Sequence, residues 1–149
     1  MVPVGVKRLA GVAVALAILA AGAAPASAAV QLVPFGTFTA PIYVTAPPGD
    51  NTRVFVVERA GKIQVVTGGV RKQFLDIHAN VLGCGERGLL SLAFRPNYAT
   101  SGVFFVFYTT KPNGDVRIEQ YSRSADPNVA NPTPTATILN ASHSASNHN

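Results

Sequence analysis

The fold is decided by a stretch in the middle of the chain, which reads Gly85-Glu86-Arg87-Gly88-Leu89-Leu90-Ser91-Leu92-Ala93-Phe94-Arg95-Pro96-Asn97-Tyr98. A glycine-rich loop leads into a short apolar run at 89–94, and Pro96 begins a turn that extends to Gly102. Short apolar runs between turn residues are typical of strands in all-β proteins. The stretch therefore predicts a loop, a strand and a turn.

Strands are also predicted on both sides of this stretch, in runs rich in Val, Ile, Phe and Tyr: 53–58, 62–66, 70–77, 103–108, 116–121 and 135–139. Beyond the amino terminus no window of ten or more residues has helical periodicity. Strands at this spacing form sandwiches, barrels or propellers. Because 89–94 and 103–108 are apolar on both faces, each sheet is expected to be covered on both sides, as stacked propeller blades are.

The amino terminus has the features of a secretory signal peptide. Lys7 and Arg8 precede the apolar run 9–24, and Ala26-Ser27-Ala28 supplies the pattern that signal peptidase cleaves. The run is shorter than the roughly 20 residues of a membrane-spanning helix, which makes an uncleaved anchor the weaker alternative. We expect residues 1–28 to be a signal peptide, residues 29–149 to form the domain, and the protein to be secreted or periplasmic without a membrane span.

The charge of the expected mature chain does not indicate a nucleic-acid partner. Removing Lys7 and Arg8 leaves ten Lys and Arg residues against seven Asp and Glu, so the net charge falls from +5 to +3. The remaining basic residues are scattered among strands and turns, whereas nucleic-acid-binding proteins gather them on one face or helix. We expect no nucleic-acid binding.

Residues 83–88 match the dinucleotide-binding pattern G-x-G-x-x-G. That pattern binds a dinucleotide only where the glycines join a strand to a helix whose amino terminus faces the pyrophosphate. Here the glycines lead into the predicted strand 89–94, and no acidic residue follows at about 20 positions, where the ribose would need one. We interpret 83–88 as a loop and exclude a nicotinamide or flavin site.

Several segments resemble, in the same order, the glucose/sorbosone dehydrogenase family, the soluble pyrroloquinoline quinone (PQQ) sugar dehydrogenases. Residues 85–98 resemble its signature G-E-x-G-L-L-G-x-A-F-H-P-x-[YF], from which Ser91 and Arg95 depart. Residues 146–149 resemble the start of its N-H-x-G-G segment. The other matching segments are 47–50, 53–58, 61–63, 74–77, 126–128 and 138–139.

The resemblance implies an all-β fold made of the N-terminal blades of a six-bladed β-propeller, truncated at residue 149. Propeller blades take roughly 40–50 residues, so six would need about twice the length of this chain. The resemblance also implies PQQ and calcium at one mouth of the central channel of the full-length parent. Their binding residues are expected beyond residue 149, and the fragment itself is expected to be inactive.

Three site residues follow from the resemblance. His148 matches the general base, which takes the proton of the anomeric hydroxyl while hydride passes to the quinone, and an imidazole pKa of about 6.5 suits this task. Glu86 matches a position that offers its side chain to the substrate, although a carboxylate paired with Arg87 is an equal alternative. Asn147 stands where some members carry Asp, so it would bind substrate or orient the site through hydrogen bonds.

The remaining cysteine and histidines form no catalytic or metal-binding pattern. Cys84 is the single cysteine, so it is either a free or buried thiol or a half-cystine whose partner lies beyond residue 149. His78 and His143 lack motif support. Because Asp76, His78 and Glu86 do not have a recognised ligand spacing, no metal site is predicted within the chain.

Two function classes remain open. The first is a PQQ-dependent sugar (aldose) dehydrogenase, an oxidoreductase that oxidises an aldose at the anomeric carbon and passes electrons to an external acceptor. The second is a non-catalytic propeller that binds a protein or glycan, as hedgehog-interacting relatives do. His148 favours the enzyme, and the absence of Trp is unusual for a binding surface built on aromatic residues.

Overall fold

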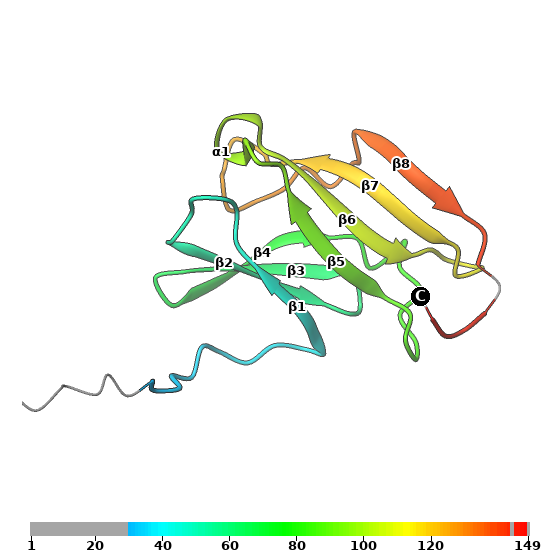
Figure 1. The fold of residues 1–149 in the computed structure, drawn as a ribbon, viewed down its shortest axis with the longest axis horizontal. Helices are drawn as coiled ribbons and strands as arrows, with labels where there is room; N and C mark the ends of the chain where they lie inside the picture. The colour runs from blue at the N-terminus through cyan, green and yellow to red at the C-terminus, as the bar shows by residue number, and fades with distance from the viewer. Residues whose placement is uncertain (1–29, 144, 149) are drawn as a thin grey trace, which may run out of the picture. The chain divides into compact units, whose positions relative to one another are not determined.

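Two four-stranded antiparallel sheets follow one another along the chain in a computed structural model that describes residues 30–143 and 145–148 (Figure 1). The predicted signal peptide, residues 1–28, lies outside the described residues. The first sheet consists of β1 (Pro41–Thr45), β2 (Arg53–Glu58), β3 (Lys62–Thr67) and β4 (Val70–Asp76). The second consists of β5 (Leu89–Phe94), β6 (Val103–Thr109), β7 (Val116–Ser122) and β8 (Ala136–Ala141).

In each sheet the strands neighbour one another in chain order, so each is a simple up-and-down meander. Short turns make several of these connections. Gly68 and Gly69, for example, join β3 to β4 and both have positive φ angles, +56° and +79°, a backbone region that glycine enters without steric cost. A four-stranded meander is the unit from which propeller blades are built.

All the predicted strands are confirmed, with ends that differ from the prediction by no more than two residues. Strand β1 was not predicted. The predicted turn at 96–102 contains the single-turn helix α1 (Tyr98–Ser101), which ends at Gly102 with φ +64°. No helix in the described part of the chain is long and apolar enough to cross a membrane.

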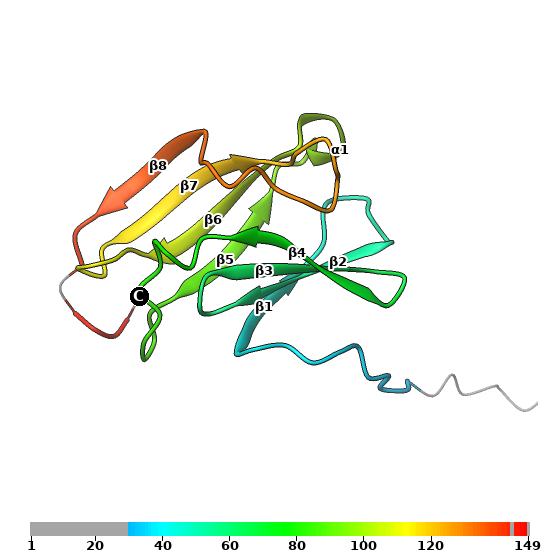
Figure 2. The ribbon, with the colours of Figure 1, turned by 180° about the vertical axis from the view of Figure 1, so that it is seen from behind.

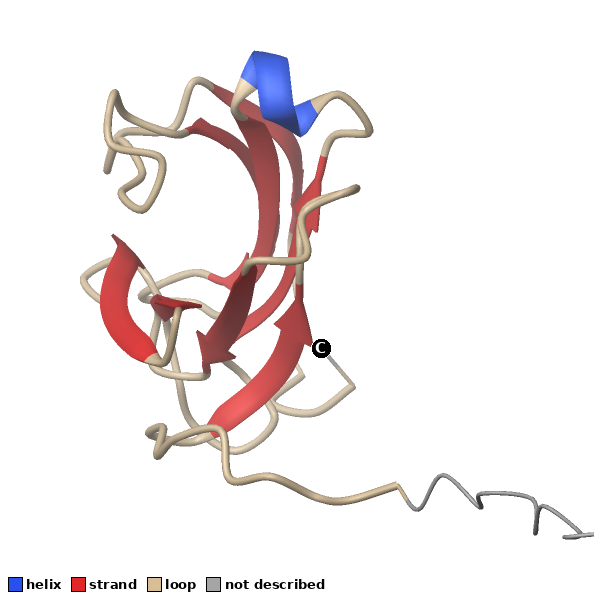
Figure 3. Cartoon of the chain, turned by 90° about the vertical axis from the view of Figure 1, so that its left-hand side faces the viewer, coloured by secondary structure: helices blue, strands red, loops and turns tan. Residues whose placement is uncertain are grey.

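The core lies between the two sheets, which Figure 3 shows edge-on. Phe55 and Phe74 from the first sheet contact Phe94 and Phe104 from the second, with ring centroids 4.9 Å apart for Phe55–Phe94 and 5.1 Å apart for Phe74–Phe104. Tyr98 of α1 packs against Phe94. Burial of one such aromatic side chain contributes about 1.5–3 kcal/mol, so these rings are a main source of cohesion between the sheets.

The second sheet alternates between a buried and a half-exposed face. Along β6 the residues Phe104, Val106 and Tyr108 are buried, whereas Phe105 and Phe107 are half-exposed. The half-exposed face contains an apolar hollow of about 280 Å³, lined in part by Phe105, Phe107 and Ile118. The expectation that both faces of each sheet are covered is therefore not met on this side within the described residues.

The long loop between β7 and β8 returns to the first sheet, as Figure 2 shows from behind. The backbone N–H of Ala130 donates to the carbonyl of Phe74 at 2.8 Å, and Arg53 Nη1 donates to the carbonyl of Pro127 at 2.8 Å. Lys72 and Asp126 form an ion pair at 2.7 Å. The second sheet thus contributes both packing and hydrogen bonds to the first.

Candidate functional site

Three loops meet at one end of the second sheet. The register pairs Leu89 with Tyr108 and Val116 with both Thr109 and Ala141. The same end of the second sheet therefore holds the start of β5, the end of β6, the start of β7 and the end of β8. Helix α1 lies at the opposite end (Figure 1). The loops at this end of the sheet are 83–88, 110–115 and the post-β8 segment (residues 142–143 and 145–148).

The loop 83–88 is fixed to both sheets. Gly88 donates its N–H to Thr109 Oγ1 at 2.9 Å, and Leu89 donates to the carbonyl of Arg59 at 2.9 Å. A Cβ at Gly88 would lie 2.6 Å from the Arg59 carbonyl oxygen, so the close approach requires glycine. The loop leads into a strand and not a helix, which removes the helix terminus that a dinucleotide would need.

Glu86 and His148, which are 62 residues apart in sequence, are in direct contact. The backbone N–H of His148 donates to Glu86 Oε2 at 2.6 Å. The alternative pairing of Glu86 with Arg87 is not among the ion pairs of the described residues. Two of the three residues singled out by the sequence thus lie side by side.

The imidazole of His148 is exposed and makes no hydrogen bond within the described part of the chain. Its backbone has φ +59°, in the left-handed region that a residue other than glycine enters at a cost of roughly 1–2 kcal/mol. The bond to Glu86 offsets part of this cost. The ring is left free to face solvent or a ligand.

Asn147 contributes its backbone to the segment. Its carbonyl oxygen lies 3.0 Å from Nε2 of His143, while the residue is exposed. His143 in turn donates its N–H to Asp115 Oδ1 at 3.2 Å, and Arg87 Nη2 donates to the carbonyl of Ala145 at 2.8 Å. His143, Asp115 and Arg87 were not predicted to be site residues, because no local pattern marks contacts between separate loops.

His78 forms a surface pair with Asp76, with Nδ1 and Oδ1 2.6 Å apart. Burial acts to raise the pKa of Asp76, but the hydrogen bonds from His78 and the charges of His78 and Lys62 outweigh it and lower the pKa. Among the described residues, no group of three or more His, Cys, Asp and Glu could hold a metal ion. Cys84 is exposed and forms no disulfide there.

The described residues do not fit a quinone that carries three carboxylates. Such a ligand needs several cationic donors with free N–H groups. Of the two arginines at the loop 83–88, Arg59 donates Nη1 to the carbonyl of Gly85 at 2.8 Å and Arg87 donates Nη2 to Ala145. Each guanidinium group keeps other N–H donors, but two arginines are fewer than the three carboxylates of the quinone, so no reaction step is assigned to these residues through a quinone.

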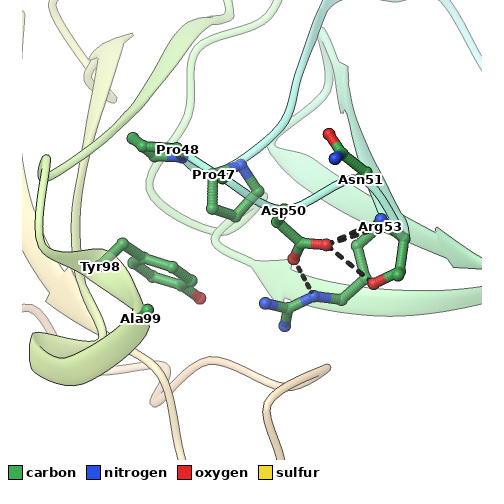
Figure 4. Close-up of a pocket in the computed structure, with 9 residues that line it drawn as sticks. Pro47, Pro48, Asp50, Asn51, Arg53, Tyr98 and Ala99 are labelled. Atoms are coloured by element: carbon green, nitrogen blue, oxygen red, sulfur yellow. Dashed lines mark hydrogen bonds and ion pairs between the residues drawn. The ribbon is translucent and has the colours of Figure 1, made fainter.

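A hollow of about 410 Å³ lies beside α1 (Figure 4). It is lined by the loop 47–53 together with Tyr98 and Ala99. Asp50 accepts hydrogen bonds from Thr52 and from Arg53 Nε, the latter at 2.6 Å. Burial acts to raise the pKa of Asp50, and these bonds outweigh it and lower the pKa. Asp50 and Arg53 thus pair with each other, whereas the hydroxyl group of Tyr98 is buried without a hydrogen-bond partner within the described residues.

A family model described as glucose/sorbosone dehydrogenase matches residues 38–148, most of the chain. The hedgehog-interacting proteins of Homo sapiens and Mus musculus are each 44% identical over 70 residues, which are 42% of this chain and 10% of the relative. The chain therefore spans about a tenth of the length of these curated relatives.

Two solved structures share the fold. The PQQ-bound aldose sugar dehydrogenase from Streptomyces coelicolor matches with a TM-score of 0.59 and 21% identity, covering 70% of this chain and 31% of that one. An oxidoreductase from Thermus thermophilus, described as a glucose dehydrogenase, matches with a TM-score of 0.60 and 18% identity, covering 71% of this chain and 30% of that one. The two sheets are thus blades of a partial β-propeller, and the chain spans about a third of these relatives.

Proposed function

The chain belongs to the glucose/sorbosone dehydrogenase family, and on this premise we propose that the whole protein is a PQQ-dependent dehydrogenase that oxidises an aldose sugar at the anomeric carbon. The observation that carries the proposal is the contact between Glu86 Oε2 and the His148 N–H at 2.6 Å. It brings the residue that matches the family's base next to the residue that matches a substrate contact.

In this proposal His148 accepts the proton of the anomeric hydroxyl. Hydride leaves a carbon more easily as its hydroxyl loses a proton, so a base beside that hydroxyl lowers the barrier. An imidazole suits the task because a neutral ring nitrogen can accept a proton. The exposed ring, free of hydrogen bonds within the described residues, is consistent with this role.

Glu86 has two separate roles in the proposal. Its Oε2 fixes the His148 backbone, and Oε1 has no hydrogen bond within the described residues, so it is available to accept one from a sugar hydroxyl. Asn147 has an exposed side chain next to His148 and is proposed as a second hydrogen-bonding contact to the substrate.

The remaining parts of the proposal concern residues outside the described structure. We propose that residues 1–28 are a signal peptide and that the protein acts outside the cytoplasm, in the periplasm or after secretion. Residues other than those described would bind the quinone and calcium, and an external acceptor would take up the electrons. When bound, the quinone supplies the electron sink.

The test is a dye-reduction assay on the intact protein as its gene encodes it, with PQQ, calcium and a panel of aldoses. We expect turnover, and we expect His148→Asn to lower kcat by about 10²- to 10⁴-fold, the usual contribution of a general base. His78→Asn is the matched control, since His78 is also exposed and has no assigned role; it should leave kcat within about twofold. Equal activity of the two variants would contradict the role of His148.

A second function is a binding module without catalysis. The local identity of 44% over 70 residues to the hedgehog-interacting proteins is the observation behind it, and this partial match does not favour it over the enzyme. Intact protein that neither binds PQQ nor reduces the dye, but binds a protein or glycan ligand, would support this alternative over the enzyme.

A further inference from the structure

We infer that Arg87 is a positioning residue that fixes the post-β8 segment and thereby places the imidazole of His148. The inference rests on the proposed function in so far as His148 is the base. It adds a residue to that site, because Arg87 stands at the unspecified position x of the signature that contains Glu86, and the segment that contains His148 does not include it.

The first observation is a pair of bonds from neighbouring residues. Glu86 accepts the N–H of His148 at 2.6 Å, and Arg87 donates Nη2 to the carbonyl of Ala145 at 2.8 Å. Two consecutive side chains of the loop 83–88 therefore bind the same segment at points three residues apart. The bond from the His143 N–H to Asp115 Oδ1 at 3.2 Å holds the start of the segment, and the bonds to Glu86 and Arg87 fix the part that carries His148.

The second observation is the surface against which the Arg87 side chain lies. A Cβ at Gly114 would lie 2.7 Å from both Nε and Nη2 of Arg87, closer than a side chain can approach. Gly114 has φ +84° and its N–H donates to the carbonyl of Thr110 at 2.7 Å. The loop 110–115 thus leaves a space for the guanidinium group that any other residue at position 114 would fill.

The third observation is that this placement is not optimal for stability. Nε of Arg87 is buried without a hydrogen-bond partner within the described residues. A buried donor without an acceptor destabilises a fold, and buried polar groups left in this way call for an explanation other than stability. Orientation of the segment that carries His148 supplies one, since misplacing a catalytic group by about 1 Å can lower a rate by about 10²-fold.

The experiment uses the intact protein and three variants. Arg87→Ala removes the guanidinium group, and Gly114→Ala occupies its space. Lys111→Ala is the matched control, because Lys111 also lies in these loops and donates to a backbone carbonyl, that of His78 at 3.1 Å, but makes no hydrogen bond to the described residues of the post-β8 segment. Hydrogen exchange at the His148 amide is measured for each variant, together with kcat and KM in the dye-reduction assay.

We expect Arg87→Ala to speed exchange at the His148 amide by about tenfold or more, the factor for one hydrogen bond of about 1.4 kcal/mol. It should lower kcat by about 10²-fold with little change in KM, and added guanidinium ion at sub-denaturing concentration should restore part of kcat. Gly114→Ala should have the same effects, and adding it to Arg87→Ala should produce little further loss because both act on one contact.

The results separate this inference from the proposed function. Unchanged exchange at the His148 amide in Arg87→Ala, or a loss of kcat as large in Lys111→Ala, would overturn the positioning role even in an active enzyme. An inactive wild-type protein would overturn the proposed function, and the exchange measurement would then decide the placement of His148 by itself.

Discussion

Glu119 is a buried carboxylate that joins two buried tyrosines in the second sheet. Its Oε2 accepts hydrogen bonds from the hydroxyl groups of Tyr108 and Tyr121, each at 2.9 Å. Burial, together with the bond to Glu119, raises the pKa of Tyr108 to about 12 and also raises the pKa of Tyr121. The two hydroxyl groups therefore keep their protons at pH values where an unfolded chain loses them.

This arrangement predicts a loss of stability in alkaline solution. An unfolded tyrosine ionises near pKa 10, whereas folded Tyr108 ionises near 12. The stabilising contribution is complete below about pH 10 and is lost as the pH rises toward about 12, with a slope of at most about 1.4 kcal/mol per pH unit for each tyrosine. Urea unfolding across this range measures the slope.

The control for this prediction is an exposed tyrosine. Tyr108→Phe should flatten the alkaline slope, whereas Tyr43→Phe should leave it unchanged, because Tyr43 is 43% exposed. A slope that is the same in Tyr108→Phe as in the wild-type protein would contradict the assignment to Tyr108.

Thr109 connects the site loop to the end of β6 through one buried hydroxyl group. Its Oγ1 accepts the N–H of Gly88 at 2.9 Å and donates to the carbonyl of Leu82 at 2.8 Å. We expect Thr109→Val to lower the free energy of unfolding by about 2–4 kcal/mol, because both backbone groups lose a buried partner. Thr109→Ser keeps the hydroxyl group and should lose about 1 kcal/mol. Equal unfolding midpoints for the two variants would disprove this role.

At the junction of the two sheets, the start of β5 depends on the glycine that precedes it. Gly88→Ala would place a Cβ 2.6 Å from the Arg59 carbonyl oxygen, which accepts the N–H of Leu89. We expect a loss of about 2–4 kcal/mol in urea unfolding, because this backbone must move away. Gly68→Ala at the β3–β4 turn is the control.

Gly68 separates the steric effect from the conformational one. It has φ +56° and open space around it, so its replacement adds only the cost of the left-handed backbone, about 1–2 kcal/mol. A loss for Gly68→Ala that matches or exceeds that for Gly88→Ala would show that crowding at Arg59 is not the cause.

Most strands were predictable because their runs of Val, Ile and Phe are bounded by turn residues, as β2 and β3 are by the glycines that follow them. Strand β1 escaped prediction for a physical reason. It begins with Pro41, and four of its five residues are exposed. Because it is held mainly by its pairing with β2, its sequence does not alternate between buried apolar and exposed polar residues. Helix α1 is a single turn, too short to produce helical periodicity.

The residues of the candidate site also differ in whether the sequence alone could predict them. Glu86 and His148 were singled out because each matches a short motif of the glucose/sorbosone dehydrogenase family. Arg87 and Ala145 are 58 residues apart, and Asp115 and His143 are 28 apart, so their partnership depends on the strand register that brings the loops together. A single sequence does not specify that register residue by residue.

The two sheets cover each other only on the faces that they turn toward one another. The half-exposed face of the second sheet contains Phe105, Phe107 and Ile118, and exposed apolar surface of this kind promotes association. We expect the polypeptide 29–149, produced alone, to aggregate or remain partly unfolded. Light scattering and a thermal melt provide the test, and a sharp, cooperative melt of a soluble monomer would count against this expectation.

Variants on this face test the cause of aggregation. Phe107→Ser combined with Ile118→Thr should lower scattering at equal concentration by removing apolar surface. Val70→Thr is the control, because Val70 is 71% exposed but lies at the β3–β4 turn. If the control lowers scattering as much as the double variant, the face is not responsible.

The contact from Ala130 to Phe74 also sets an order of events during synthesis. The first sheet is translated by residue 76, but the loop that bonds to β4 follows about 50 residues later. At about 5–20 residues per second, the ribosome needs roughly 3–10 s to supply that partner. During this interval the carbonyl of Phe74 in β4 lacks its partner from the loop. This interval is therefore the period in which the nascent first sheet exposes the most surface to a chaperone.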